Sequence, residues 1–464
     1  MHSDAADERS LVIDTGLLSP VTVGHDADLS DAAFAAALIT AEVALTRAWN
    51  LVGAAPVEAA DAVDAAFGFA PGSGSADAGA DSGGGIAEID VPELIESAVA
   101  GGNPVIPLVG MLRAGVPEEA RGWVHRGATS QDIFDTAMML FARDAGFALL
   151  GALDEIDDSL TEFALAHRDL VAAARTLTQH AVPTTVGLRA ANWARGVRRA
   201  ALKLEAALEQ LPAQLAGAGG TLAAFVQIGG PEAAEKLPGS YAELLGLAVP
   251  DGSWHTVRWP VTELGDALVQ AVDALGVIAA DVATLSRTEI GELAEGSGGG
   301  SSAMPQKRNP AGSVLIRSAA IRAPQLAATL HAAAALAVDE RPDGAWHAEW
   351  QTLRELLRLA CGAAGNAAAL VEGLSVDAEA VARNLALTGG LIVAERLSIE
   401  LGPRIGADRV KRLVAAAGRG EDLAELLRAE PALAGLDVAE LLDPAGYTGL
   451  AGELVDRLDF DTEL

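Results

Sequence analysis

The sequence predicts an all-α protein built around a central bundle of long helices. Apolar residues recur three or four positions apart over long stretches, Ala, Leu and Val are abundant, and alternating strand patterns are nearly absent. The longest stripe covers about six turns at 3.6 residues per turn and consists of Leu264, Leu268, Val272, Leu275, Ile278, Val282 and Leu285. Such stripes are typical of helices that pack against one another along their length.

Two further stripes predict helices upstream of this one. The first consists of Leu149, Leu153, Ile156, Leu160 and Phe163, and the second of Leu204, Leu208, Leu211 and Leu215. Pro212 falls inside the second stripe and predicts a kink or the end of that helix, because proline lacks the backbone N–H that a helix needs.

Three breaks interrupt the helical pattern. Residues 70–85 are so rich in Gly, Ser and Ala that they predict a mobile surface insertion. Residues 227–231 predict a helix stop, followed by a further helix and a loop over residues 250–260. Residues 296–302 (GSGGGSS) form a glycine-rich loop between two long helices. Loops of this kind often act as lids over active sites.

The composition excludes several classes of partner. The chain has 464 residues, and its 64 acidic residues outnumber its 32 Lys and Arg, which gives a formal net charge of −32. This charge repels nucleic acid and anionic membrane surfaces, so neither is an expected partner. A site for an anionic substrate must then be locally positive, built from clustered Arg, Lys and helix N-termini.

Other features of the chain predict a cytoplasmic protein. Cys361 is the only cysteine, which rules out an intrachain disulfide and a thiolate metal cluster supplied by one chain. Residues 1–10 lack the apolar region of a signal peptide. No apolar run of about 18 residues is convincing as a membrane span, since charged residues such as Asp281, Arg317 and Arg322 interrupt some candidates.

The most specific motif is GSSAMPQKRNP at residues 300–310. It matches the pattern GSSxMPxKxNP of the fumarase/aspartase superfamily at all eight fixed positions of eleven. The resemblance implies removal of a proton next to a carboxylate, stabilisation of the resulting aci-carboxylate dianion, and loss of a group from the next carbon. It implies that Ser301 is the base, that Lys307 supplies positive charge, and that Asn309 donates a hydrogen bond to a substrate carboxylate. The neighbouring Ser302 and Met304 are candidate substrate contacts.

A second motif, WVHRGATSQDIFDT at residues 123–136, resembles the HxGxTSxD segment of relatives of adenylosuccinate lyase. Thr129, Ser130 and Gln131 are suited to holding carboxylate oxygens at a helix N-terminus, although Thr129 or Ser130 could merely cap the helix that follows. His125 is a further candidate substrate contact or, equally, a structural histidine. Outside this motif, the anion-binding candidates are Arg341 and, less strongly, His255 and Arg258, with salt bridging as the alternative for each.

A third motif, RTLTQHAVPTTVG at residues 175–187, resembles the family segment RTHxQxAxPTTxG but departs from it at one position. Leu177 stands where fumarases and adenylosuccinate lyases have a histidine that assists the leaving group. Leucine cannot transfer a proton, whereas a carboxylate leaving group, with a pKa near about 4, needs no acid. Gln179 and His180 are candidate substrate contacts, and His180 could take over proton transfer.

Four shorter segments indicate a subfamily. Those at 101–108, 253–258, 339–350 and 384–390 resemble bacterial 3-carboxy-cis,cis-muconate cycloisomerases. This resemblance implies reversible lactonisation of a small polycarboxylate to 4-carboxymuconolactone, a step of protocatechuate degradation, without a metal or organic cofactor. Asn103 stands where adenylosuccinate lyases tend to have a functional histidine, which argues against purine chemistry.

The resemblance also implies an architecture of three helical domains, like that of L-aspartase and fumarase. We expect an N-terminal domain over residues 1–115, a central long-helix bundle over 116–365, and a C-terminal domain over 366–464. We expect a homotetramer whose active sites are shared between chains. Two alternatives remain open: adenylosuccinate lyase or another fumarate-forming lyase of the superfamily, and a catalytically silent structural protein of the same fold.

Overall fold

The structure is a computed structural model that describes residues 15–68, 89–296, 299–300 and 304–458. Its first helices are α1 (Asp31–Leu51), α2 (Val57–Phe67), α3 (Val91–Gly101), α4 (Val105–Ala114) and α5 (Glu118–Arg121). The longer helices that follow are α6 (Ser130–Ala166), α7 (Val186–Glu209), α8 (Ala223–Leu245), α9 (Trp259–Leu285), α10 (Ala311–Ala335) and α11 (Gly344–Glu372). The last helices are α12 (Ala378–Ala386), α13 (Ala394–Ile405), α14 (Ala407–Ala417), α15 (Leu423–Arg428), α16 (Val438–Leu442) and α17 (Ala451–Asp456). The all-α prediction is confirmed.

Two short antiparallel pairs are the exception to the helical pattern. Strand β1 (Val171–Thr176) pairs with β2 (Gln179–Thr185), and β3 (Leu293–Ala294) pairs with β4 (Ser375–Val376). The first pair is the third sequence motif folded as a hairpin. The sequence did not predict it, because the motif lacks the alternation of apolar and polar residues that marks a strand.

The chain divides into two compact units that alternate along the sequence. Unit 1 comprises residues 1–152, 200–273 and 318–365, and unit 2 comprises residues 153–199, 274–317 and 366–464. Helices α6, α7, α9, α10 and α11 each contribute one part to either unit. The expected division into three consecutive domains stays a prediction.

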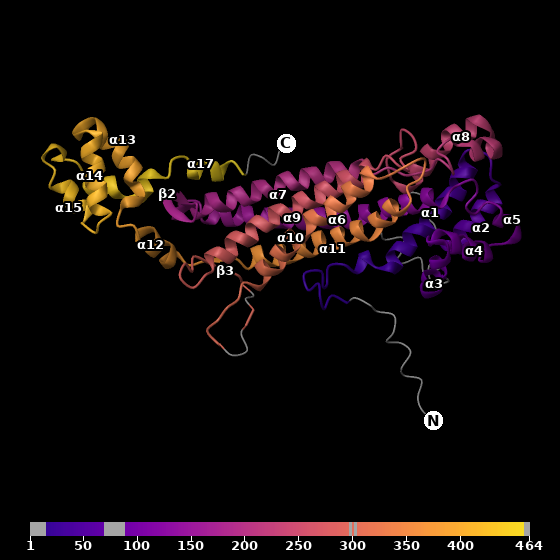
Figure 1. Ribbon diagram of the computed structural model, residues 1–464, viewed down its shortest axis with the longest axis horizontal. Coiled ribbons are helices and arrows are strands. Elements are labelled where there is room, and N and C mark those ends of the chain that lie inside the picture. Colours follow the sequence, from indigo (N-terminus) through magenta and orange to yellow (C-terminus); the bar gives the residue numbers. More distant parts are fainter. Residues whose placement is uncertain (1–14, 69–88, 297–298, 301–303, 459–464) are drawn as a thin grey trace, which may run out of the picture. The chain divides into compact units, whose positions relative to one another are not determined.

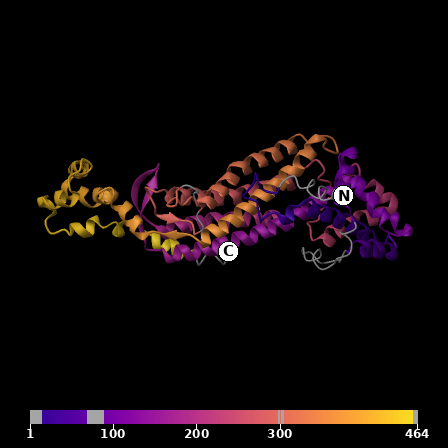
Figure 2. The same ribbon diagram turned by 90° about the horizontal axis from the view of Figure 1, so that it is seen from below.

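Unit 1 combines the short N-terminal helices with parts of the long ones. Helix α1 packs against α2 and α8 around the fully buried Trp49 and Phe225, whose rings meet edge to face. The unit 1 parts of α9, α10 and α11 run side by side (Figure 1, Figure 2). A Cβ atom at Gly265 of α9 would lie 2.9 Å from Leu330 of α10, so glycine allows these two helices to approach closely.

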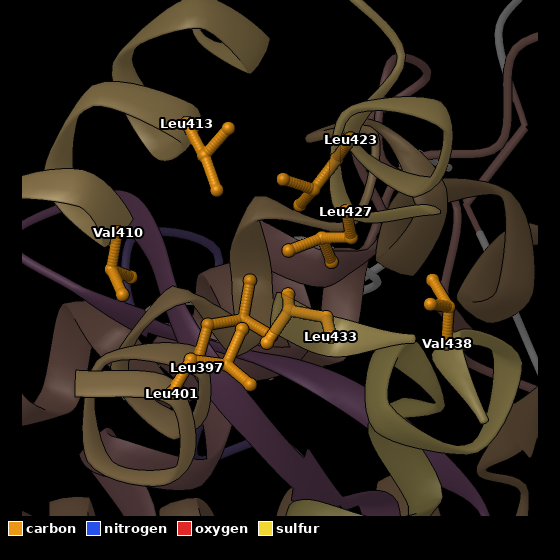
Figure 3. Packing of buried hydrophobic residues seen from close by; sticks show 8 residues of the cluster. All are labelled: Leu397, Leu401, Val410, Leu413, Leu423, Leu427, Leu433 and Val438. Atoms are coloured by element: carbon orange, nitrogen blue, oxygen red, sulfur yellow. The ribbon is translucent and has the colours of Figure 1, made fainter. Parts of the chain in front are cut away.

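Unit 2 contains the β1–β2 hairpin, the remaining parts of the long helices and the C-terminal helices (Figure 1). A leucine-rich core holds α13, α14, α15 and α16 together (Figure 3). Its buried members are Leu397, Leu401, Val410, Leu413, Leu423, Leu427, Leu433 and Val438. Burial of this much apolar surface explains how helices of only five to twelve residues are stable here, since isolated helices so short are not.

The predicted stripes and breaks can be located in these helices. All seven residues of the longest stripe are buried in α9, and four of the five in the α6 stripe are buried, Phe163 being partly exposed. Helix α7 ends at Glu209, ahead of Pro212. The predicted helix stop is a kink inside α8, where Gly230 has φ 82° and ψ 170°. The insertion at 70–85 lies outside the described residues.

Three helices are long and apolar enough to cross a membrane by length and composition: α1, α6 and α9. The expectation that no such stretch would be convincing was therefore wrong. In α1 and α6, 61% and 67% of the most apolar window is buried inside the protein, against 44% in α9. Helix α6 also buries Asp132, Asp135 and Arg143, which are costly to place in lipid.

Candidate active site

In unit 1, a buried carboxylate organises the loop that leads into α6. Asp132 is fully buried and accepts hydrogen bonds from the backbone N–H groups of Thr129, Ala216 and Gly217, each at 3.0 Å. Its Oδ1 also lies 2.9 Å from Nε2 of His255. The Asp132 carboxylate thus connects the second motif to the segment around residues 216–217, which follows α7. Asp132 stood in the quoted HxGxTSxD pattern but was not among the predicted site residues.

Arg341, more than 200 residues later in the sequence, binds to the same loop. Its guanidinium donates to the Thr129 hydroxyl and to the carbonyl of Ala218, the latter at 3.2 Å. Ser130, the first residue of α6, is half-buried beside Thr129. The structure therefore brings together three of the predicted anion-binding residues, with a guanidinium and a helix N-terminus as sources of positive charge.

Gln131 points into the protein interior. Its side chain is fully buried, and its Nε2 donates to Asp135 Oδ2 at 3.1 Å and to the carbonyl of His255 at 2.9 Å. Gln131 thus links α6 to the backbone at His255. A direct contact between Gln131 and the substrate stays a prediction.

Arg258 and His255 do not have the surroundings expected of anion-binding residues. The guanidinium of Arg258 is buried between Asp135, at 2.6 Å, and Glu349, also at 2.6 Å. Burial lowers the pKa of Arg258, but the two carboxylates raise it more. His255 is 1% exposed and engaged by Asp132. For Arg258 the structure shows the salt-bridging alternative, whereas Nε2 of His255 lies at hydrogen-bond distance from Asp132 and an anion contact for His255 stays a prediction.

His125 and Asn103 also have specific partners in unit 1. Nδ1 of His125 lies 2.7 Å from Oε1 of Glu42 on α1. Asn103 is buried, and its side chain accepts a hydrogen bond from the backbone N–H of Val105 at 2.8 Å. Asn103 is thus a structural residue at the start of α4.

In unit 2, the hairpin presents the position where the family histidine is missing. Leu177 and Thr178 form its two-residue turn with φ 48° and 71°. Turns with both central φ values positive favour Asn and Gly, so leucine here is strained. Leu177 is 96% exposed, and Gln179 beside it is also exposed. Burial and the charge of Arg175 lower the pKa of the neighbouring His180, against an opposing effect of Glu292.

The end of the hairpin next to its turn is held by an ion pair whose carboxylate is buried. Arg175 donates two hydrogen bonds to Glu292, which is 1% exposed and also accepts from Asn384 at 2.9 Å. Burial raises the pKa of Glu292, but the hydrogen bonds from Arg175 and Asn384 and the charges of Arg175 and Arg189 lower it below its ordinary value. Glu292 was not predicted from the sequence, because it belongs to none of the quoted motifs.

The glycine-rich loop of unit 2 is closed at its neck by two backbone hydrogen bonds. The N–H of Gly299 donates to the carbonyl of Asn309 at 2.9 Å, and the N–H of Asn309 donates to Gly299 at 2.8 Å. Lys307 is exposed, and no side-chain hydrogen bond or ion pair engages it among the described residues. Met304 is 44% exposed. Ser301 and Ser302 lie outside the described residues.

The predicted site residues thus fall into two groups. His125, Thr129, Ser130, Gln131 and Arg341 belong to unit 1, whereas the hairpin and the glycine-rich loop belong to unit 2. Within the described ranges, no group of three or more His, Cys, Asp or Glu side chains could hold a metal ion. The expectation of a cofactor-free reaction stays a prediction.

Comparison with known proteins gives a consistent result. A family model described as a lyase matches residues 26–324. The nitrosuccinate lyase of Streptomyces davaonensis is 44% identical over 477 aligned positions, covering 98% of this chain and 97% of its own. The 3-carboxy-cis,cis-muconate cycloisomerase of Pseudomonas aeruginosa is 40% identical, covering 90% of this chain and 89% of its own. The crystal structure of the 3-carboxy-cis,cis-muconate lactonizing enzyme of Pseudomonas putida superposes with a TM-score of 0.85 at 33% identity, covering 97% and 99%.

Proposed function

Since this chain belongs to the fumarase/aspartase family of lyases, we propose that it acts on a small polycarboxylate whose leaving group is a weak base. This proposal rests on one observation: the exposed tip of the hairpin carries Leu177, which cannot donate a proton. An alcohol or amine leaving group needs a proton donor, whereas a carboxylate leaves unassisted. A leucine at this position is compatible only with the second kind of chemistry, unless another residue supplies the proton.

The first candidate reaction is reversible closure of 3-carboxy-cis,cis-muconate to 4-carboxymuconolactone in protocatechuate degradation. One substrate carboxylate adds to the neighbouring double bond, charge collects on a second carboxylate as an aci-dianion, and Ser301 delivers a proton to carbon. Lys307 and Asn309 stabilise the dianion. Identity of 40% to the cycloisomerase and the superposition on the lactonizing enzyme support this candidate.

A second candidate is removal of nitrite from nitrosuccinate. It is favoured by the 44% identity to nitrosuccinate lyase, which extends over nearly both chains. The chemistry is related: a proton leaves the carbon next to a carboxylate, the C–N bond breaks, and fumarate forms. Nitrite, like a carboxylate, is a weak base that needs no general acid. Leu177 is therefore compatible with both candidates.

Membership of this family also predicts how the chains assemble. Because the chain belongs to the fumarase/aspartase family, we propose a cytoplasmic homotetramer with active sites shared between chains. Analytical ultracentrifugation would report a single species of four times the chain mass, and a stable monomer with full activity would contradict it.

Two assays with purified protein test the substrate. The first follows the loss of ultraviolet absorbance of 3-carboxy-cis,cis-muconate, and the second measures nitrite released from nitrosuccinate. Each is run with wild type and with Ser301→Ala. Rapid turnover of carboxymuconate that Ser301→Ala abolishes supports the cycloisomerase, and nitrite release with the same dependence supports the lyase. If neither occurs, both candidates fail, and adenylosuccinate and other substituted succinates become the next substrates to try.

A further inference from the structure

One face of α1 holds the loop that contains His125. Glu42, Thr46 and Trp49 are spaced four and three residues apart and so share a face of the helix. Their hydrogen-bond partners in the loop are His125 at 2.7 Å, the carbonyl of Trp123 at 3.2 Å and the carbonyl of Arg126 at 2.9 Å, respectively. Three bonds from one rigid helix fix the position of this loop within unit 1.

His125 adopts a backbone conformation that needs such support. Its φ is 59°, in the left-handed region, which for a residue with a side chain costs about 1 kcal/mol. Strained residues of this kind persist where the surroundings hold them, and they are common at functional sites. The bond to Glu42 reaches across 83 residues of sequence and is therefore a tertiary restraint on the imidazole.

Of the two side chains in the Glu42–His125 pair, Glu42 is the more deeply buried. The Glu42 side chain is 1% exposed, and its second oxygen, Oε2, has no hydrogen-bond partner among the described residues. A buried carboxylate with one unpartnered oxygen is costly unless a positive charge is close. The imidazole is the group within bonding distance of it, which favours the charged form of His125.

The other charges around His125 act in both directions. Burial lowers the pKa of His125, the charge and hydrogen bond of Glu42 raise it, Asp132 on α6 raises it further, and Arg113 on α4 lowers it. The net result is a pKa above the ordinary value for histidine. His125 is therefore charged at lower pH and loses its charge as the pH rises through this raised pKa.

We propose that Glu42 is a positioning residue that holds His125 as an imidazolium, whose Nε2–H is the donor for a substrate carboxylate. Nδ1 is occupied by Glu42, the imidazole is 18% exposed, and no hydrogen bond of Nε2 lies among the described residues. The same loop ends at Thr129, where Arg341 bonds. In a chain of net charge −32, a second fixed cation on the loop that Arg341 contacts helps to bind a polyanion. This inference rests on the proposed function.

The first test observes His125 directly. Protein labelled with ¹⁵N at its eight histidines is titrated by NMR, and the His125 resonance is identified by its loss in His125→Gln. We expect a pKa above that of a free histidine in wild type, and a value at least about one unit lower in Glu42→Gln. Asp64→Asn, which removes another buried carboxylate paired with an arginine, is the matched control and leaves the His125 titration unchanged.

The second test measures catalysis. Glu42→Gln should raise KM about tenfold and change kcat less than about threefold, because a charge–charge contact in the bound state is weakened. The alkaline limb of kcat/KM should move to lower pH in Glu42→Gln but not in Asp64→Asn. A merely structural role would lower the melting temperature without moving this limb.

Specific outcomes overturn the inference. A neutral His125 in wild type at pH 7 refutes it even where Glu42→Gln does not fold. If the His125 titration is unchanged in Glu42→Gln, Glu42 does not hold the charge of His125. If the titration shifts but KM is unchanged, His125 does not take part in substrate binding. If wild type turns over neither proposed substrate, titration with tricarballylate still tests the inference: a perturbed His125 Nε2 signal supports it, and no perturbation at saturating ligand opposes it.

Discussion

Arg341 donates a hydrogen bond to the hydroxyl of Thr129 although 212 residues separate the two in the sequence. This contact joins the loop before α11 to the loop before α6. Neither loop alone identifies an anion site, since arginine is common on surfaces and threonine is common at helix starts. Their direct contact is what makes the pair a candidate for holding a substrate carboxylate.

Arg341→Lys should lower kcat/KM by about 10- to 100-fold, because an ammonium cannot bond Thr129, Ala218 and a substrate oxygen with the planar geometry of a guanidinium. Arg322→Lys is the control, since Arg322 forms an exposed ion pair with Glu355 on the neighbouring helix and should tolerate the change. Steady-state kinetics of both variants decide the matter. Full activity in Arg341→Lys would remove Arg341 from the site.

Leu177→Ala should change kcat by less than about tenfold. Loss of a general acid typically costs about 100- to 10,000-fold, so a small effect is the expected signature of a position that transfers no proton. His180→Gln is the companion variant, because His180 lies on the next strand and could supply the proton instead. A loss above about 100-fold in Leu177→Ala would contradict the weak-base leaving group, and the same loss in His180→Gln alone would assign the acid to His180.

Glu292→Gln should destabilise the protein by about 3 kcal/mol, because it leaves the guanidinium of Arg175 without its buried counter-charge. The pKa of Glu292 is lowered by folding, so its stabilisation is complete above its ordinary value of about 4.5 and is lost as the pH falls through the lower, folded value. Melting curves should therefore show a constant difference from wild type between about pH 7 and 5 and a shrinking difference at more acidic pH.

Glu232→Gln gives the comparison for this experiment. Glu232 forms a fully solvated ion pair with Lys236 on α8, and its removal should leave the melting temperature unchanged. Equal destabilisation by the two substitutions would mean that the hairpin does not depend on its buried ion pair.

Lys307→Ala should lower kcat by at least about 100-fold without changing the melting temperature. Lys307 is exposed, and no described side chain depends on it for a partner, so its removal costs no folding energy, whereas the developing dianion loses a fixed cation. Lys203→Ala, an exposed lysine on α7, controls for the change in net charge. Unaltered turnover in Lys307→Ala would contradict the role that the GSSxMPxKxNP motif implies.

The helices could be predicted from the sequence, whereas the partners of buried charges could not. The α9 stripe is local, because a helix face repeats within a few residues and is visible in any window. Arg258 looked like an anion-binding candidate, since its partners Asp135 and Glu349 lie 123 and 91 residues away and nothing local reveals them. The hairpin was missed for local reasons: its strands lack the alternation of apolar and polar residues, and its turn uses Leu177 and Thr178 where asparagine and glycine are usual.

The alternation of the two units along the chain has a consequence for synthesis. Unit 1 needs residues 318–365 and unit 2 needs residues 366–464, so neither unit is complete until most of the chain has left the ribosome. Domains that are continuous in sequence can fold one after another as they emerge, but this arrangement does not permit that order. The face of α1 that packs against α8 stays without this partner until residues 223–245 have been synthesised, which prolongs the exposure of apolar surface on the nascent chain.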